Sequence, residues 1–219
     1  MKVNNHTITN DFFKLDLLKG ATLVGLFDFP MINPTNLNLQ MIEALPINYA
    51  KSCKNPNNYV LHFYVDDYQF ERMYNTPSKY LNMLKNFKYI IAPDFSLYLD
   101  MPRAMQIWNC YRNRALTYYY QTNGIEVIPN VSWSDEFSFS YCFDGLPKNS
   151  TLAVSSVGCM KNPKALLNFC KGFEAMMDSL QPRQVIVFGQ LPESLKKYKN
   201  IKIINTFYNK FEKFNQGGI

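Results

Sequence analysis

The stretch KYIIAPDFSLY at residues 88–98 decides the fold class. It begins as a short, nearly continuous apolar run, which is typical of a strand buried on both faces of a parallel sheet. The polar residues Asp94 and Ser96 follow, and residues 101–123 then place apolar side chains at helical spacing. A buried strand, a polar turn and an amphipathic helix in succession predict an α/β protein.

The same unit recurs along the chain. Helical patterns are expected at 68–86 with a break at Pro77, at 101–123, at 162–180 and, as a short helix, at 194–198. With residues 88–98, the apolar β-rich runs give seven candidate strands: 22–30, 58–67, 88–98, 125–133, 151–158, 184–192 and 201–207.

Seven strands joined by crossover helices predict a mostly parallel sheet in one α/β domain over residues 1–219. We expect a barrel-like arrangement, because no Gly-rich turn follows the first run; an open doubly wound sheet is the alternative. Neither an internal repeat nor a Gly/Ser linker divides the chain. The polar, basic residues 208–219 are expected to form a flexible tail.

Composition excludes several classes of protein. Apolar residues make up 47 % and charged residues 18 % of the chain, which excludes wholesale disorder. The 5 cysteines form no Cys-x-x-Cys pair and there are only 2 histidines, which argues against a zinc site and a disulfide framework. No signal peptide or membrane span is recognised, so we expect no membrane association and a cytoplasmic protein.

The net charge of +6 lies entirely in the second half. Residues 1–100 hold 9 basic and 9 acidic side chains, whereas residues 101–219 hold 14 basic and 8 acidic ones. This asymmetry indicates an anionic partner such as a nucleic acid; the alternative is a mildly basic surface with no specific role.

Carboxylates end three successive predicted strands at Asp28, Asp66 and Asp94. Converging carboxylates hold Mg²⁺ or Mn²⁺, or act as general acid and base when burial or a like charge raises one pKa. The alternative is that each caps a helix or accepts from loop amides. Asp94 stands out because it follows a fully apolar run, where a charge needs a partner.

Other polar residues lie near the same predicted edge. Arg103 falls in the first helical turn, where a guanidinium and free amides together favour an anion such as phosphate. Ser155 and Ser156 occupy a turn between a strand and a helix, the context of a phosphate-binding loop, but without its glycine and lysine pattern. Asn130 and Trp133 follow the fourth run, and His62 is expected to be a core histidine.

Several motifs together resemble an uncharacterised family. They are APDFS at 92–96, Tyr-x-Asp-x-Pro at 98–102, QIWN at 106–109, Tyr-Arg-x-Arg at 111–114, GIEVIPN at 124–130 with Trp133, FDG at 143–145 and AVSSVG at 153–158. The family is the domain of unknown function numbered forty-four seventeen, found in bacteria, phages and plasmids. It has no established activity, so the resemblance implies residence on a mobile element and no reaction. Its motif positions here are Asp94, Ser96, Asp100, Arg103, Gln106, Asn130 and Trp133.

The first hypothesis is a phage- or plasmid-type accessory protein, in the host cytoplasm if it is phage-encoded. It would bind a phosphate-bearing ligand, either a nucleotide or a nucleic acid. Arg103 would hold phosphate, Trp133 would stack on a base, and Gln106, Ser96, Asn130, Ser155 and Ser156 would complete the ligand site. A metal-assisted phosphoester hydrolase would use Asp94, Asp100 and Asp66 as catalytic groups and Asp94, Asp66 and Asp28 as ligands of Mg²⁺ or Mn²⁺.

Two other hypotheses need no catalysis. In one, the protein binds a host or replication protein through its many aromatic residues. In the weaker one, the basic second half binds DNA without sequence preference. The sequence leaves open whether the protein is an enzyme.

Overall fold

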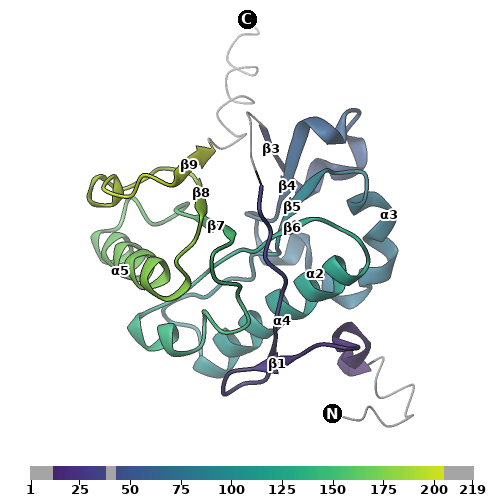
Figure 1. The fold of residues 1–219 in the computed structure, drawn as a ribbon, viewed down its shortest axis with the longest axis horizontal. Helices are drawn as coiled ribbons and strands as arrows, with labels where there is room; N and C mark the ends of the chain where they lie inside the picture. The colour runs from purple at the N-terminus through teal and green to yellow at the C-terminus, as the bar shows by residue number, and fades with distance from the viewer. Residues whose placement is uncertain (1–11, 38–42, 205–219) are drawn as a thin grey trace, which may run out of the picture.

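The computed structural model describes residues 12–37 and 43–204. Its parallel strands form two sheets, and a separate small antiparallel hairpin lies below them in the view of Figure 1. The four-stranded sheet contains β3 (Glu43–Pro46), β4 (Tyr59–His62), β5 (Tyr89–Ile91) and β6 (Val127–Ile128) in that order. The three-stranded sheet contains β7 (Thr151–Ser155), β8 (Gln184–Phe188) and β9 (Ile201–Ile204), and the hairpin contains β1 (Leu23–Val24) and β2 (Phe29–Pro30).

Helices cover the outer faces of both sheets (Figure 1). The α-helices are α2 (Glu71–Asn75), α3 (Leu81–Leu84), α4 (Arg103–Thr122) and α5 (Pro163–Leu180). The 3-10 helices are η1 (Leu15–Leu18), η2 (Ile47–Ser52), η3 (Pro56–Asn58), η4 (Asp67–Gln69), η5 (Pro77–Tyr80), η6 (Glu136–Ser140) and η7 (Glu193–Leu195). No helix of this described part is long and apolar enough to cross a bilayer.

The two long helices begin and end as their sequences predict. At the start of α5 the Asn162 side chain accepts hydrogen bonds from the amides of Lys164 (2.9 Å) and Ala165 (3.2 Å), and Pro163 is its first residue. After α4, Gly124 takes a positive φ of 79°. The predicted break at Pro77 is also confirmed, because α2 ends before it and η5 begins with it.

Three apolar clusters form the core. One packs α2 and α3 on the four-stranded sheet, and one packs α5 on the three-stranded sheet. The third takes at least one side chain from each of the parallel strands β3 to β9: Ala44, Val60, Ile91, Ile128, Ala153, Ile186, Phe188 and Ile204. The inner faces of both sheets therefore share one core.

The prediction of one barrel-like sheet of seven strands was wrong. Between β6 and β7 the ladder is reduced to a single parallel bridge that joins Asn130 and Ala153. Pro129 gives its carbonyl to the Ala153 amide (2.8 Å) but has no amide of its own to continue the ladder. Thr35 fills the gap: its hydroxyl donates to the Val127 carbonyl (2.6 Å), and its carbonyl accepts from the Thr151 amide (2.8 Å).

The prediction of a parallel strand at residues 22–30 was also wrong. Residues 22–30 form the antiparallel hairpin β1–β2, with Gly25 (φ 74°) and Asp28 (φ 53°) in its turn. Only glycine fits at residue 25, because a Cβ there would lie 2.0 Å from Asp144 Oδ2. The place of the first parallel strand is taken by β3, which the sequence did not indicate. Strand order is sequential in each sheet, without the reversal of a doubly wound sheet. The predicted tail at 208–219 lies outside the described residues.

Candidate functional site

A cavity of about 600 Å³ lies at the carboxyl ends of β4, β5, β6 and β7. Its walls are the loops after these strands and the first part of α5. Open α/β sheets bind ligands at this edge, because loops from adjacent parallel strands converge there. The predicted site residues that line the cavity are Asp66, Asp94, Ser96, Asp100, Trp133 and Ser155.

Asp94 is held by neutral hydrogen-bond donors. Its Oδ1 atom accepts from Asn130 Nδ2 (2.7 Å) and from Ser132 Oγ (2.5 Å). Asn130 is fixed in turn by the Tyr64 hydroxyl, which donates to Asn130 Oδ1 (2.8 Å). We call Tyr64, Asp94, Asn130 and Ser132 the Asp94 cluster. The second carboxylate oxygen, Oδ2, accepts no hydrogen bond from any described residue, so it is the atom that Asp94 offers to the cavity.

The environment of Asp94 favours its protonated form. Burial raises the pKa of the carboxyl to about 6, against the opposing effect of the hydrogen bonds from Ser132 and Asn130. The charge of Asp67 raises it further. A carboxyl with this pKa exchanges protons near neutral pH, which is what a general acid or base requires.

His62, the last residue of β4, stacks on the Tyr64 ring of this cluster (ring centroids 5.5 Å apart). Residues 60, 62 and 64 alternate onto one side of the strand, where His62 packs against Phe188 (ring centroids 4.4 Å apart). Burial lowers the pKa of His62 to about 3, so the ring is neutral. Its Nδ1 accepts from the Tyr64 amide (3.1 Å), while Nε2 is buried with no partner in the described part of the chain. His62 is thus the core histidine that the sequence predicts.

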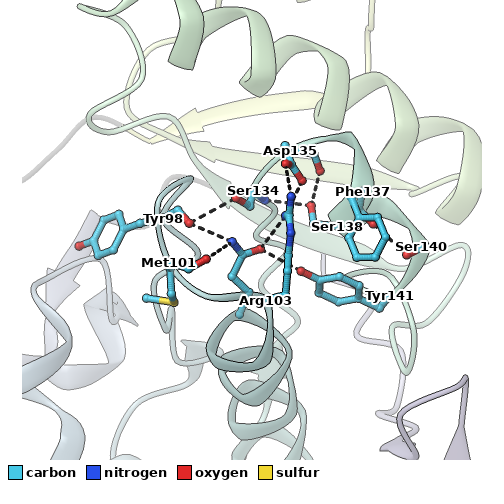
Figure 2. A network of polar contacts seen from close by, with 10 residues as sticks. Tyr98, Met101, Arg103, Ser134, Asp135, Phe137, Ser138, Ser140 and Tyr141 are labelled. Atoms are coloured by element: carbon cyan, nitrogen blue, oxygen red, sulfur yellow. Dashed lines mark hydrogen bonds and ion pairs between the residues drawn. The ribbon is translucent and has the colours of Figure 1, made fainter.

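Arg103 lies in a second network, beside the cavity rather than in it (Figure 2). Its guanidinium binds both oxygens of Asp135, at 2.7 and 2.5 Å, and lies over the Phe137 ring. The anion expected at the start of this helix is therefore a carboxylate of the same chain. Hydrogen bonding to Asp135 raises the pKa of Arg103, and the same bond holds the pKa of Asp135 below its usual value. A phosphate role for Arg103 would require this pair to break.

Gln106 is fully buried beneath Arg103. Its Nε2 atom donates to the carbonyls of Tyr98 (3.1 Å) and Met101 (2.9 Å), and its Oε1 accepts from the Tyr141 hydroxyl (2.9 Å). Gln106 therefore fixes the loop that precedes α4 and does not line the cavity.

Trp133 forms a wall of the cavity against α5. Its ring packs on Phe169, and its Nε1 donates to the Asn168 carbonyl (3.2 Å). The close approach requires Gly172, where a Cβ would lie 2.1 Å from Trp133 Nε1. The indole edge is thus occupied by the protein, and stacking on a ligand is left to the part of the ring that faces the cavity.

The serines have mainly local partners. Ser96 donates its amide and hydroxyl to Asp67 (hydroxyl to Oδ1, 2.7 Å). The buried Ser156 accepts from the Gln190 amide (2.9 Å). Ser155 accepts from the Val157 amide (3.3 Å) and lines the cavity, which Ser156 does not.

The predicted carboxylates are only partly brought together. Asp66, Asp94 and Asp100 line the same cavity, whereas Asp28 is exposed in the turn of the hairpin β1–β2 and lies outside it. Within residues 12–37 and 43–204, no group of three or more His, Cys, Asp or Glu side chains is arranged to hold a metal ion. Asp66 accepts instead from Gln69 Nε2 (3.2 Å).

Sequence reasoning missed Tyr64 and Ser132, and it placed Asp135 at the end of the fourth run without connecting it with Arg103. Alternation along β4 places Tyr64 on the same face as the core residues Val60 and His62, and this signal was available. No local signal connects Ser132 with Asp94 or Asp135 with Arg103, because these pairs are 38 and 32 residues apart.

Comparison with known proteins places these residues in a family. The family model described as Domain of unknown function (DUF4417) matches residues 21–208. The Gene 1 protein of Mycobacterium phage L5 is 36 % identical over 165 residues, which are 75 % of this chain and 72 % of that protein. The Gene 1 protein of Mycobacterium phage D29 is 34 % identical over 165 residues, 75 % of this chain and 61 % of that protein. No solved structure matches the chain at a significant level.

Proposed function

Because the chain belongs to the family Domain of unknown function (DUF4417) and is similar to mycobacteriophage proteins, we propose that it is a phage-type accessory protein that binds a nucleoside or nucleotide in the cavity. The base would enter the cavity, and Asp94 would exchange a proton or a hydrogen bond with it. The observation that carries this proposal is the Oδ2 atom of Asp94, which has no described partner and belongs to a carboxyl with a pKa of about 6.

The chemistry of the cavity suits a base better than a phosphate. Three carboxylates and the aromatic residues Tyr64, Tyr98 and Trp133 are among its lining residues, and no Lys, Arg or His is among those described. A base supplies N–H donors for a carboxylate and a flat face for an aromatic ring. A phosphate would be repelled from this lining, so it would remain at the mouth of the cavity.

Thermal melting with separate probes tests the proposal. The probes are nucleosides, their mono- and triphosphates, short single-stranded DNA and inorganic phosphate. A ligand at about 100 times its dissociation constant adds about 2.7 kcal/mol to the stability of the folded state. We expect nucleosides to raise the melting temperature of the wild type and of Asp178→Asn, an exposed carboxylate on α5, but not of Asp94→Asn. Shifts of equal size in both variants would contradict the proposal.

A metal-assisted phosphoester hydrolase is an alternative use of the same cavity, in which a divalent cation would offset the repulsion between carboxylates and phosphate and would place the phosphate, rather than the base, beside Asp94. Mg²⁺ is commonly bound by one or two carboxylates together with the phosphates of the substrate, so Asp66, Asp94 and Asp100 need not form a complete metal site by themselves. Turnover of a nucleotide that requires Mg²⁺ or Mn²⁺ and is lost in Asp94→Asn would support it. Turnover that is unaffected by a chelator would contradict it.

An interaction protein is the second candidate function. Tyr98, Leu99, Met105, Trp108 and Phe137 are exposed on or beside the first turns of α4. Exposed aromatic residues are enriched at protein interfaces. A stoichiometric complex with a host or replication protein that is lost in Met105→Ser/Trp108→Ser would favour this function. A complex unchanged by these substitutions would argue against this surface.

A further inference from the structure

We infer that Arg103, Asp135 and Gln106 are positioning residues of the cavity: they hold the loop before α4 against the loop after β6 and so set how far the mouth opens. The inference extends the proposed function, since it concerns the same cavity, but it needs no ligand. Arg103 is thereby assigned a role in the shape of the site rather than in contact with phosphate.

The contacts join the two loops directly. Tyr98 lines the cavity from the loop before α4, and Ser134 lines it from the loop after β6. The Tyr98 carbonyl accepts from Gln106 Nε2 (3.1 Å) and from Ser134 Oγ (3.4 Å). Asp135, the next residue after Ser134, is held by Arg103 through two hydrogen bonds (Figure 2).

The two loops follow neighbouring strands, β5 and β6, but they are anchored on different helices. Trp133, in the loop after β6, is anchored on α5, which covers the three-stranded sheet. The loop before α4 follows β5 of the four-stranded sheet and is anchored on α4 through Gln106. The contacts at the mouth therefore add to the Asn130–Ala153 bridge, the Thr35 hydrogen bonds and the shared core that already join the two sheets.

A positive charge at the position of Arg103 is electrostatically unfavourable without a partner such as Asp135. Arg103 is the first residue of α4, where the helix dipole favours negative charge and opposes a cation. Asp135 compensates with both carboxylate oxygens, and the Ser138 hydroxyl fixes Asp135 by donating to its backbone carbonyl (2.6 Å). An arginine kept at this position by a fixed partner indicates that the pair itself is the useful feature.

Fluorescence of Trp133 tests the inference. The chain has 2 tryptophans, so Trp108→Phe provides a parent protein in which Trp133 is the sole tryptophan and can be excited selectively at wavelengths that tyrosine does not absorb. Acrylamide, a neutral quencher, then reports how accessible this wall of the cavity is. We expect Arg103→Gln to raise the Stern–Volmer constant of Trp133, and the charge exchange Arg103→Asp/Asp135→Arg to restore the parent value. Added salt should raise the constant in the parent and not in Arg103→Gln.

A matched ion pair away from the cavity provides the control. Lys197 and Glu174 are 2.6 Å apart and similarly exposed, and Lys197→Gln should leave Trp133 quenching unchanged. The inference is wrong if Arg103→Gln melts cooperatively with parental quenching, if the charge exchange fails to restore the value, or if Lys197→Gln has the same effect. Because no ligand is added, these results neither support nor contradict nucleoside binding, which the melting experiment tests separately.

Discussion

Asp94 lies in the loop after β5 and Asp135 in the loop after β6, and the protein gives these two carboxylates opposite properties. Asp94 is surrounded by neutral donors, and burial raises its pKa to about 6. Asp135 is paired with the guanidinium of Arg103, and the hydrogen bonds between them lower the pKa of Asp135. Two hydrogen bonds from an amide and a hydroxyl do not offset the desolvation of a carboxylate, whereas a charged partner near solvent does. The first arrangement suits proton exchange and the second suits a fixed contact.

The largest expected effect comes from Asp94→Asn. The folded-state pKa of Asp94 is about 6 and lies above its ordinary value, so the stability that this group contributes is present in acid and is lost as the pH rises through 6. A rise of the Asp94 pKa from 3.8 to about 6 means that the ionised carboxylate destabilises the folded protein by about 3 kcal/mol. Asparagine keeps the acceptor for Asn130 and Ser132 and removes the charge.

The variant should therefore be more stable than the wild type above pH 6 while losing ligand binding. Denaturant unfolding at a series of pH values measures the difference. Equal stability of the two proteins at every pH would show that Asp94 is not perturbed as described.

Removal of the buried side-chain amide of Gln106 has the next largest expected effect. Gln106→Leu leaves the carbonyls of Tyr98 and Met101 and the Tyr141 hydroxyl without this partner. Unsatisfied buried polar groups destabilise by about 1–3 kcal/mol each, and we expect a net loss in this range. Urea unfolding compares it with Gln190→Leu, at an exposed residue. A loss no greater than that of the control would contradict the described role of Gln106.

The smallest effect is expected for Asp135→Asn, and its sign is opposite to that of Asp94→Asn. A lowered folded-state pKa contributes stability above the unfolded pKa that disappears as the pH falls through the folded value. The variant should be slightly less stable than the wild type at neutral pH, and the difference should fade in acid and in high salt, because the pair is partly exposed. A difference that persists at high salt would indicate a role other than the ion pair.

Local pattern predicted much of the fold. The long helices α4 and α5, the break at Pro77 and the strands β4, β5, β7, β8 and β9 follow from periodicity and from Pro, Gly and Asn at element ends. The hairpin β1–β2 and the short strand β3 were not predicted. A run such as residues 22–30 has the same composition in a hairpin as in a buried strand, and only its pairing partner distinguishes the two.

The division into two sheets also escaped prediction for a physical reason. Pro129 is visible in the sequence, but the insertion of Thr35 between β6 and β7 depends on contacts across about 90 and 115 residues. Sequence reasoning placed the candidate residues at the edge where the cavity lies, because parallel strands share a direction and their carboxyl ends coincide whatever the sheet order.

By itself the sequence determined that this is an α/β protein, that its polar residues gather at the carboxyl ends of the strands, and that Asp94 would be a carboxyl next to an apolar run. Only the tertiary structure decided what each group faces. It gave Asp94 the neutral partners Asn130 and Ser132, gave Arg103 the carboxylate of Asp135, and left Asp28 outside the cavity. Periodicity and end signals act between near neighbours in the chain, whereas desolvation and charge pairing depend on residues brought together from distant segments.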